Sequence, residues 1–253
     1  MFPEERRTII IKTLNHQGRC LVNDLSQQMR VSEVTIRQDL DCLEREGLLR
    51  RTHSGAILPS KTGFERSFQA EETSFRTQKE RIAQAASELV SPGDTLILDV
   101  GTTVAELARA LLNHEDLTVF TNALNIAAIL EANPRITTIV TGGTLRAKQH
   151  SLVNPFATLI LDKIKADLAF IGISGIEANY GLTNVNIPEA EIKAIFLKAA
   201  ERRVILADSS KIGKIGLMKI SEIEQIDLLI TDKEADPKNI ASLRQKGLKI
   251  KLV

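Results

Sequence analysis

Apolar residues recur with helical spacing in three short segments at the start of the chain. The first covers residues 4–16, between Pro3 and Gly18, which are residue types that favour the two ends of a helix. A second helix is expected to begin at Asn23, because asparagine caps helix N termini well. A third follows Ser32 after a tight turn. This spacing predicts a small three-helix module.

The third helix is amphipathic, and its polar side carries residue types that recognise DNA. Ile36, Leu40 and Leu43 form one apolar stripe that we expect to pack on a core. Hydroxyl, guanidinium, amide and methyl groups on the other side suit phosphates and base edges. The expected DNA contacts of this helix are Ser32, which also caps it, Val34, Thr35, Arg37 and Gln38. Most amphipathic helices with a polar face are simply solvated, so the neighbouring segments decide between the two interpretations.

A short hairpin is expected directly after this helix. Gly47 ends the helix, and residues 48–58 have strand character with a turn near Ser54. Two short helices, a turn, a third helix and a hairpin make a winged helix-turn-helix, whose last helix enters the major groove. The candidate phosphate contacts on the hairpin are Arg50, Arg51 and His53.

Beyond residue 58 the pattern changes twice. Residues 59–78 contain proline, glycine and many charges without clear periodicity, so they are expected to form a linker. From residue 79 onward, helical segments alternate with short apolar strands, which is typical of a sheet covered on both faces. These strands are expected at 95–100, 117–121, 136–141, 167–173, 203–208, 227–231 and 248–252. The sequence thus predicts a winged helix-turn-helix domain over residues 1–58 and a larger, mostly parallel α/β domain over residues 79–253.

The net charge limits the kind of nucleic-acid partner. The chain of 253 residues has a formal net charge of +1, and residues 1–60 contain nine Lys/Arg and eight Asp/Glu residues. Proteins that coat nucleic acid need a large basic excess, because phosphate neutralisation dominates such binding. Aromatic residues make up 4% of the chain, too few for a surface that stacks single-stranded bases. The near-neutral small domain counts against DNA binding, but the charge of one face matters more than the total. We therefore still expect duplex DNA as the partner, held by cations gathered on one face of this domain.

No other class of site is indicated by the cysteines, the histidines or the apolar runs. Cys20 and Cys42 have neither a metal-binding nor a redox spacing, and the four histidines are scattered. We expect reduced cysteines, no metal site and no cofactor. No apolar run is long enough to cross a membrane, and the start lacks a signal-peptide core. The chain is therefore expected to be cytoplasmic, without a membrane partner.

Small and polar residues stand where the strands of the large domain are expected to end. Ligands of open parallel sheets bind beyond the carboxyl ends of the strands. In Asp99-Val100-Gly101-Thr102-Thr103, glycine permits close backbone approach, and the helix start and hydroxyls offer donors to an anion. Taken alone, that segment is equally compatible with threonine capping a helix. Five strand ends carry such residues, and the candidate contacts of a phosphorylated polyol, which come from four of them, are Asp99, Gly101, Thr102, Thr103, Asn122, Gly142, Gly143 and Lys211.

Both halves resemble the DeoR family of bacterial transcription regulators. Residues 4–58 are similar to its winged helix-turn-helix, with Thr35-Ile36-Arg37-x-Asp39-Leu40 as the specific signature and Arg51–Ala56 as a further match. The rest resembles its sensor domain, which is similar in fold to ribose-5-phosphate isomerase, glucosamine-6-phosphate deaminase and CoA transferases. The resemblance implies that Gly101, Thr102, Thr103 and Lys211 hold a sugar phosphate, and that Asp99 and Asn122 contact the sugar. Gln38, Ser54 and Asn154 depart from the family pattern.

These features together predict a sequence-specific transcriptional regulator. The favoured form is a repressor of an operon for carbohydrate uptake or catabolism, released from its operator when a phosphorylated sugar binds. A homodimer or homotetramer is expected, because DNA half-sites are spaced by helical turns.

Two other classes of function are considered. One is a sugar-phosphate isomerase, deaminase or transferase, for which Asp99, Glu189, Asp208 and Lys211 offer acid–base groups. No catalytic pairing is visible among them, so we expect no enzyme activity. The other is an activator or an architectural DNA-binding protein, and the near-neutral charge argues against the architectural form.

Overall fold

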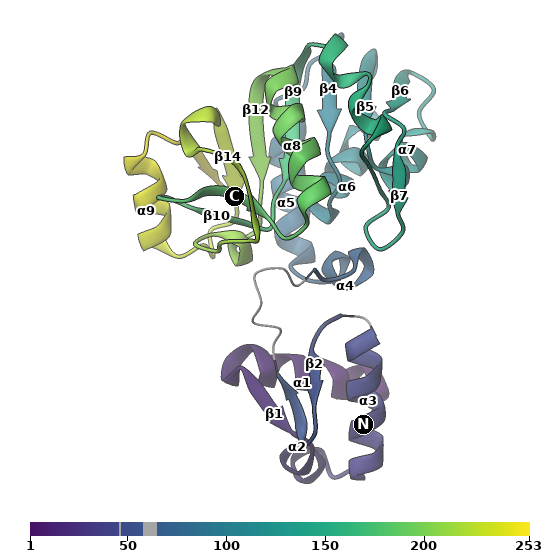
Figure 1. The fold of residues 1–253 in the computed structure, drawn as a ribbon, viewed down its shortest axis with the longest axis vertical. Coiled ribbons are helices and arrows are strands. Elements are labelled where there is room, and N and C mark those ends of the chain that lie inside the picture. Colours follow the sequence, from purple (N-terminus) through teal and green to yellow (C-terminus); the bar gives the residue numbers. More distant parts are fainter. Residues whose placement is uncertain (46, 58–64) are drawn as a thin grey trace. The chain divides into compact units, whose positions relative to one another are not determined.

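The computed structural model describes residues 1–45, 47–57 and 65–253 (Figure 1). The contacts between these residues divide the chain into two compact units, Met1–Glu71 and Glu72–Val253. Residue 58 of the predicted hairpin and residues 59–64 of the predicted linker lie outside the described residues.

The N-terminal unit is a winged helix-turn-helix, as the sequence predicts. Its elements are α1 (Pro3–Gln17), β1 (Arg19–Leu21), α2 (Val22–Met29), α3 (Glu33–Arg45), β2 (Arg50–Thr52) and β3 (Gly55–Ile57). The strands form an antiparallel sheet in the order β1-β3-β2. The apolar stripe of α3, Ile36, Leu40 and Leu43, is buried in a core that α1 and α2 share, which confirms its predicted packing.

Two local details of this unit differ from the prediction. α2 begins at Val22, so Asn23 lies in its first turn and does not cap it. The Val22 N–H donates to the Ser54 carbonyl oxygen at 2.9 Å, which joins the helix start to the hairpin. The link before α2 is a strand, since Cys20 is buried and pairs with Ala56 of β3. A strand of three residues carries too little periodicity to be recognised in a sequence.

Part of the segment predicted as a linker is helical. α4 (Phe68–Glu72) and the first residues of α5 (Arg76–Ser87) lie within residues 59–78. The expectation of irregular structure is therefore wrong for these residues. Phe68 and Ala70 are buried, whereas the other residues of α4 are polar or charged. Two buried positions are too few to produce a periodic pattern, which is why the helix was not predicted.

The C-terminal unit is built on a seven-stranded parallel sheet, which confirms the predicted α/β class. Its strands are β4 (Thr95–Leu98), β5 (Leu117–Thr121), β6 (Ile136–Val140), β9 (Ala166–Gly172), β12 (Ala200–Leu206), β14 (Leu228–Thr231) and β15 (Ile250–Leu252). They lie in the order β15-β14-β12-β9-β4-β5-β6, and all neighbouring pairs are parallel. Each overlaps a strand expected from the sequence.

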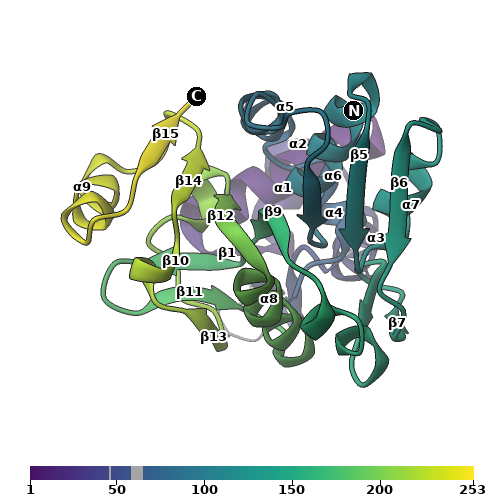
Figure 2. The ribbon, with the colours of Figure 1, turned by 90° about the horizontal axis from the view of Figure 1, so that it is seen from above.

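Helices cover both faces of this sheet. Figure 2 shows α5 and α6 (Thr102–Ala110) on one face and α8 (Ile187–Ala199) on the other. α7 (Leu124–Leu130) lies beside β6, and α9 (Pro237–Gln245) lies at the opposite end of the sheet. Residues 96–98 of β4 are 0% exposed, as expected for a central strand packed on both sides.

Smaller elements, which the sequence did not predict, complete the unit. A hairpin consists of β7 (Thr144–Arg146) and β8 (Ser151–Val153), and an antiparallel sheet consists of β10 (Gly175–Glu177), β11 (Gly181–Asn184) and β13 (Met218–Ser221). The 3-10 helices are η1 (Leu111–Asn113), η2 (Phe156–Thr158), η3 (Leu161–Lys163), η4 (Ser209–Lys211) and η5 (Ile223–Gln225). Across the described residues, no helix has both the length and the apolar character needed to cross a membrane.

Candidate functional site

The candidate effector contacts follow the carboxyl ends of neighbouring strands. β12, β9, β4, β5 and β6 are adjacent in that order and parallel, so their carboxyl ends lie along one edge of the sheet. The predicted contacts come from these ends: Asp99, Gly101, Thr102 and Thr103 after β4, Asn122 after β5, Gly142 and Gly143 after β6, and Lys211 after β12. Ligands of parallel sheets bind at such an edge.

Asp99 is fully buried and forms an ion pair with Lys193 of α8. Its Oδ2 atom accepts a hydrogen bond from the Gly172 N–H at 3.1 Å and another from the Lys193 ammonium. The two charged side chains are 0% and 3% exposed, respectively. Burial raises the pKa of Asp99 to about 6, although the Lys193 charge acts in the opposite direction. The Oδ1 atom is buried and has no hydrogen-bond partner among the described residues.

Asn122 presents a second acceptor of this kind at the next strand end. The residue is buried, and its Nδ2 group donates to the Leu152 carbonyl oxygen at 3.2 Å. Its Oδ1 atom has no partner within the described part of the chain. Buried polar atoms are nearly always hydrogen bonded in folded proteins. The free oxygens of Asp99 and Asn122 therefore favour a ligand with hydroxyl donors, or ordered water in its place.

Gly101 shapes the loop between β4 and α6. Its φ of +143° is a conformation that residues with a side chain rarely adopt. Among the described residues, no neighbouring atom lies within 4 Å of the position that a Cβ would take. Gly101 occupies the N-cap position of α6, and among the described residues no side chain caps that helix. The alternative that a threonine caps it is therefore wrong, and Thr102 and Thr103 are buried in its first turn. An uncapped helix start beside open space suits an anion.

The two glycines after β6 fold the β7–β8 hairpin back toward Asn122. At Gly143, with φ +124°, a Cβ would stand 2.4 Å from the Val153 carbonyl oxygen, so the close approach requires glycine. Gly142 also has a positive φ, of +77°. The Leu152 N–H of the hairpin donates to the Asn122 carbonyl oxygen at 2.7 Å. The hairpin is thus hydrogen bonded to the loop after β5.

Glu189 connects this hairpin to α8. Its Oε1 atom contacts the Arg146 guanidinium of β7 and accepts from the Ser151 hydroxyl of β8 at 2.7 Å. Its Oε2 atom accepts from Asn184 Nδ2 at 3.3 Å, and the side chain is 7% exposed. Because Lys193 follows four residues later, α8 directs a carboxylate and an ammonium toward the strand ends from one face.

Lys211 follows β12, and Asp99 follows β4, which lies two strands away from β12 in the sheet. It ends η4, where its N–H donates to the Asp208 carbonyl oxygen at 3.0 Å. The Asp208 side chain is buried and accepts from the Ser210 N–H at 3.0 Å, so it shapes this turn. Lys211 itself is half-buried. The structure thus brings Lys211 to the predicted edge, with the β9 end between it and Asp99.

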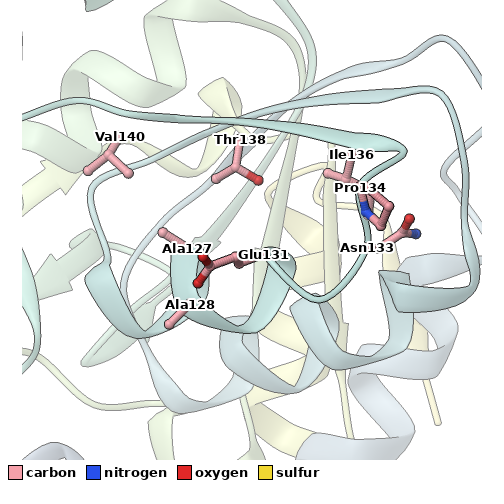
Figure 3. A pocket seen from close by; sticks show the side chains of 8 residues that line it. All are labelled: Ala127, Ala128, Glu131, Asn133, Pro134, Ile136, Thr138 and Val140. Atoms are coloured by element: carbon pink, nitrogen blue, oxygen red, sulfur yellow. The ribbon is translucent and has the colours of Figure 1, made fainter.

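A shallow groove of about 410 Å³ lies elsewhere, between α7 and the edge strand β6 (Figure 3). Its lining residues are Ala127, Ala128, Glu131, Asn133, Pro134, Ile136, Thr138 and Val140. None of the candidate effector contacts is in this lining. Glu131 is its one titratable side chain, and a carboxylate repels phosphate. We therefore assign the groove no part in the site.

The exposed side of α3 carries most of the candidate DNA contacts. The Thr35 N–H donates to the Ser32 hydroxyl oxygen at 3.1 Å, so Ser32 caps the helix as predicted. Val34 is 64% exposed, so its side chain is accessible near the start of the helix. Gln38 is exposed on the same side.

The arginines of this unit differ in how they are held. Arg37 is partly exposed and pairs with Glu33, one turn earlier in α3, at 3.0 Å. On the wing, Arg50 and His53 are exposed. Arg51 instead contacts α3 and is 21% exposed.

Comparison with known proteins assigns both units to one family. Residues 6–62 match the DeoR-like helix-turn-helix domain, and residues 74–233 match the DeoR C terminal sensor domain. The chain is 36% identical over 252 residues to a putative aga operon transcriptional repressor of Escherichia coli O157:H7, covering 98% of this chain and 93% of that protein. The chain belongs to the DeoR family. It is also 31% identical over 228 residues to the glycerol-3-phosphate regulon repressor of Escherichia coli (strain K12), covering 90% of each protein.

The predicted class of function is confirmed for this DeoR-family protein. Its relatives are named as transcriptional regulators and repressors, so the chain is a transcriptional regulator. The structure of ribose 5-phosphate isomerase a from Methanocaldococcus jannaschii aligns with 55% of each chain, with a TM-score of 0.42 and 21% identity. That likeness concerns the fold alone.

Two charged side chains near the strand ends of this DeoR-family sensor domain were not predicted as site residues from the sequence. They are Lys193, which pairs with Asp99, and Arg146, which contacts Glu189. A signal for Lys193 exists in the sequence: it shares a helix face with Phe196 and Leu197, which are buried. A charged residue inside an apolar stripe indicates a buried partner. Arg146 lies in a hairpin too short to be recognised by periodicity.

Proposed function

We propose that this DeoR-family regulator is a repressor of an operon for carbohydrate uptake or catabolism, and that a phosphorylated sugar releases it from its operator. The names of the two relatives above support the repressor role and an operon for small-molecule metabolism. The sensor domain supports a small-molecule effector. In this proposal α3 enters the major groove, and Arg50 and His53 contact phosphates from the wing.

The observation that carries the effector class is the pair of unpartnered acceptors on adjacent strand ends, Asp99 Oδ1 and Asn122 Oδ1. Two buried acceptors favour a ligand with neighbouring hydroxyl donors, as in a polyol or sugar. The uncapped start of α6 beside Gly101 favours an anion on the same ligand. Lys211 supplies a cation from the end of β12. Hydroxyl donors and an anion together describe a sugar phosphate.

Release of DNA follows from thermodynamic linkage between the two domains. A ligand shifts an equilibrium only by its difference in affinity for the two states, and the coupling is reciprocal. The effector is therefore expected to bind free protein more tightly than DNA-bound protein. We expect a homodimer or homotetramer, so that two α3 helices reach half-sites one or more helical turns apart.

A thermal-unfolding panel tests the effector class. Sugar phosphates are each compared with the unphosphorylated sugar and with inorganic phosphate, using an external dye because the chain has no Trp. A ligand at a hundred times its dissociation constant stabilises a protein by roughly 2.7 kcal/mol. We expect a rise in melting temperature with one or a few sugar phosphates and none with their parent sugars. A rise with the parent sugar of equal size, or no rise with any phosphate, would contradict the proposed effector class.

A further inference from the structure

Arg51 of β2 contacts the recognition helix α3 at three positions. Its N–H donates to Glu44 Oε1 at 2.7 Å. Its guanidinium contacts the Asp41 carboxylate and donates to the Arg37 carbonyl oxygen at 3.2 Å. Residues 37, 41 and 44 are successive neighbours on one face of a helix. The wing strand is therefore joined to α3 along a defined stripe, through both the backbone and the side chain of Arg51.

These contacts hold the Arg51 side chain away from solvent. It is 21% exposed, and its Nε atom is buried without a hydrogen-bond partner among the described residues. Arg50 is exposed, as expected because successive side chains of a strand point to opposite faces. A phosphate contact requires a cation that reaches the DNA backbone and displaces its counterions. The exposed Arg50 is the candidate for such a contact, whereas the charge of Arg51 already faces a carboxylate.

Asp41, which pairs with Arg51, places a negative charge on the exposed side of α3. Its side chain is 56% exposed, and it follows the exposed Gln38 by three residues, which places both on one side of the helix. An unpaired carboxylate on a DNA-facing surface repels phosphates. Its pairing with Arg51 offsets part of that repulsion and joins α3 to the wing strand.

We propose that Asp41, Glu44 and Arg51 form a wing latch, which sets the position of the β2–β3 hairpin against α3. In this proposal Arg51 is a positioning residue for DNA binding, and Arg50 and His53 are the residues that meet phosphates. The inference rests on the DNA-binding function proposed above, and it replaces the phosphate contact that the sequence suggested for Arg51.

The first test needs no DNA. Amide hydrogen exchange is measured on the full chain, and residues 50–57 are followed separately from α1 and α2 of the same unit. Asp41→Ala and Arg51→Ala are expected to speed exchange in the wing while α1 and α2 stay as in the wild type. Arg50→Ala, the matched control, is expected to leave wing exchange unchanged. Glu44→Ala is expected to speed it, and Glu44→Gln, which keeps an acceptor oxygen, to restore it. Unchanged wing exchange in both Asp41→Ala and Arg51→Ala would overturn the latch.

A variant whose N-terminal unit fails to fold is recognised because exchange also rises in α1 and α2, which belong to the same compact unit as the wing. Arg51→Lys then replaces Arg51→Ala: it keeps the charge but loses the planar fork that reaches Asp41 and the Arg37 carbonyl together. Faster wing exchange in Arg51→Lys supports the latch, and wild-type exchange contradicts it.

The second test uses a duplex that the full-length wild-type chain selects from a random-sequence pool. Its dissociation constant is measured over a range of salt concentrations. Asp41→Ala is expected to weaken binding roughly three- to tenfold, although it removes a negative charge from the DNA-facing side. Arg51→Ala is expected to weaken binding without changing the salt slope, whereas Arg50→Ala lowers that slope by about 1. Tighter binding by Asp41→Ala, or a salt slope in Arg51→Ala that falls as in Arg50→Ala, would overturn the proposal.

The two tests separate the latch from the function on which it rests. Failure of the wild type to select any duplex contradicts the DNA-binding function. The exchange measurement then still decides whether Asp41 and Arg51 hold the wing.

Discussion

Asp99 and Lys193 lie 94 residues apart in the chain and form a buried ion pair at the carboxyl end of β4. The pair joins the loop after β4 to α8, whose Glu189 holds the β7–β8 hairpin. Removing one member of a buried pair leaves an uncompensated charge, which is strongly destabilising. The pair therefore fixes a carboxylate at the strand end, with its Oδ1 oxygen still able to accept a hydrogen bond.

Lys193→Met is expected to destabilise the protein by about 3–5 kcal/mol, because it leaves the Asp99 carboxylate buried without its cation. Urea unfolding at neutral pH measures this free energy. The control is Lys198→Met, an exposed lysine of the same helix, for which a change within about 0.5 kcal/mol is expected. Equal effects of the two substitutions would show that the ion pair does not hold the strand end to α8.

The raised pKa of Asp99 predicts a pH dependence of stability. Its value is about 6 in the folded protein, against an ordinary value of 3.8. Between these values the folded state binds more protons than the unfolded state, so the group's contribution is full at low pH and is lost as pH rises through about 6. The wild type should therefore lose up to about 3 kcal/mol relative to Asp99→Asn between pH 4 and pH 7. Urea unfolding of both proteins across this range measures the difference, and parallel curves would argue against the raised pKa.

The strands of the main sheet were predictable because each contains apolar residues next to turn residues. The signal is strongest in the central strand β4, which is buried on both faces, as Leu96, Ile97 and Leu98 illustrate. The strand-end segments were also predictable, since the carboxyl ends of adjacent parallel strands meet. The short hairpins were not, because strands such as β7 (Thr-Leu-Arg) and β8 (Ser-Leu-Val) contain no continuous apolar run.

Contacts between residues far apart in the chain limit how much of each site could be predicted from the sequence. The sequence indicates Asp99 as a polar residue at a strand end, but its partner Lys193 is brought there only by the packing of α8 on the sheet. Likewise, strand alternation distinguishes the directions of Arg50 and Arg51, but it does not show that Asp41 and Glu44 receive the second arginine. A partner fixed by tertiary packing cannot be read from local spacing.

Arg37→Ala is expected to weaken binding to the selected duplex, because Arg37 lies on the exposed part of α3 and a base contact contributes about 1–3 kcal/mol. Its partner Glu33 is an exposed neighbour one turn away, so the loss of their pairing should change stability little. Fluorescence anisotropy with labelled duplex measures the affinity. The control is Arg135→Ala, an exposed arginine of the sensor domain. If DNA affinity survives Arg37→Ala at the wild-type level, Arg37 is not a DNA contact.

Lys211→Ala is expected to abolish the stabilisation by a sugar phosphate while leaving DNA affinity as in the wild type. The reason is that a charge-assisted hydrogen bond to phosphate is lost at the strand-end site and the winged helix is untouched. The thermal-unfolding panel measures the stabilisation by the sugar phosphate, and the anisotropy measurement gives the DNA affinity. Lys214→Ala, an exposed lysine three residues further on, is the matched control. A normal ligand response in Lys211→Ala would remove this lysine from the effector site.

The most direct test of the proposed regulation is a titration of the protein–duplex complex with the sugar phosphate that raises the melting temperature. Anisotropy of the labelled duplex reports its release from the full-length wild-type protein. The account predicts that DNA is released over the concentration range in which the sugar phosphate binds, and that the parent sugar and inorganic phosphate have no effect. Undiminished DNA binding at saturating sugar phosphate would contradict it.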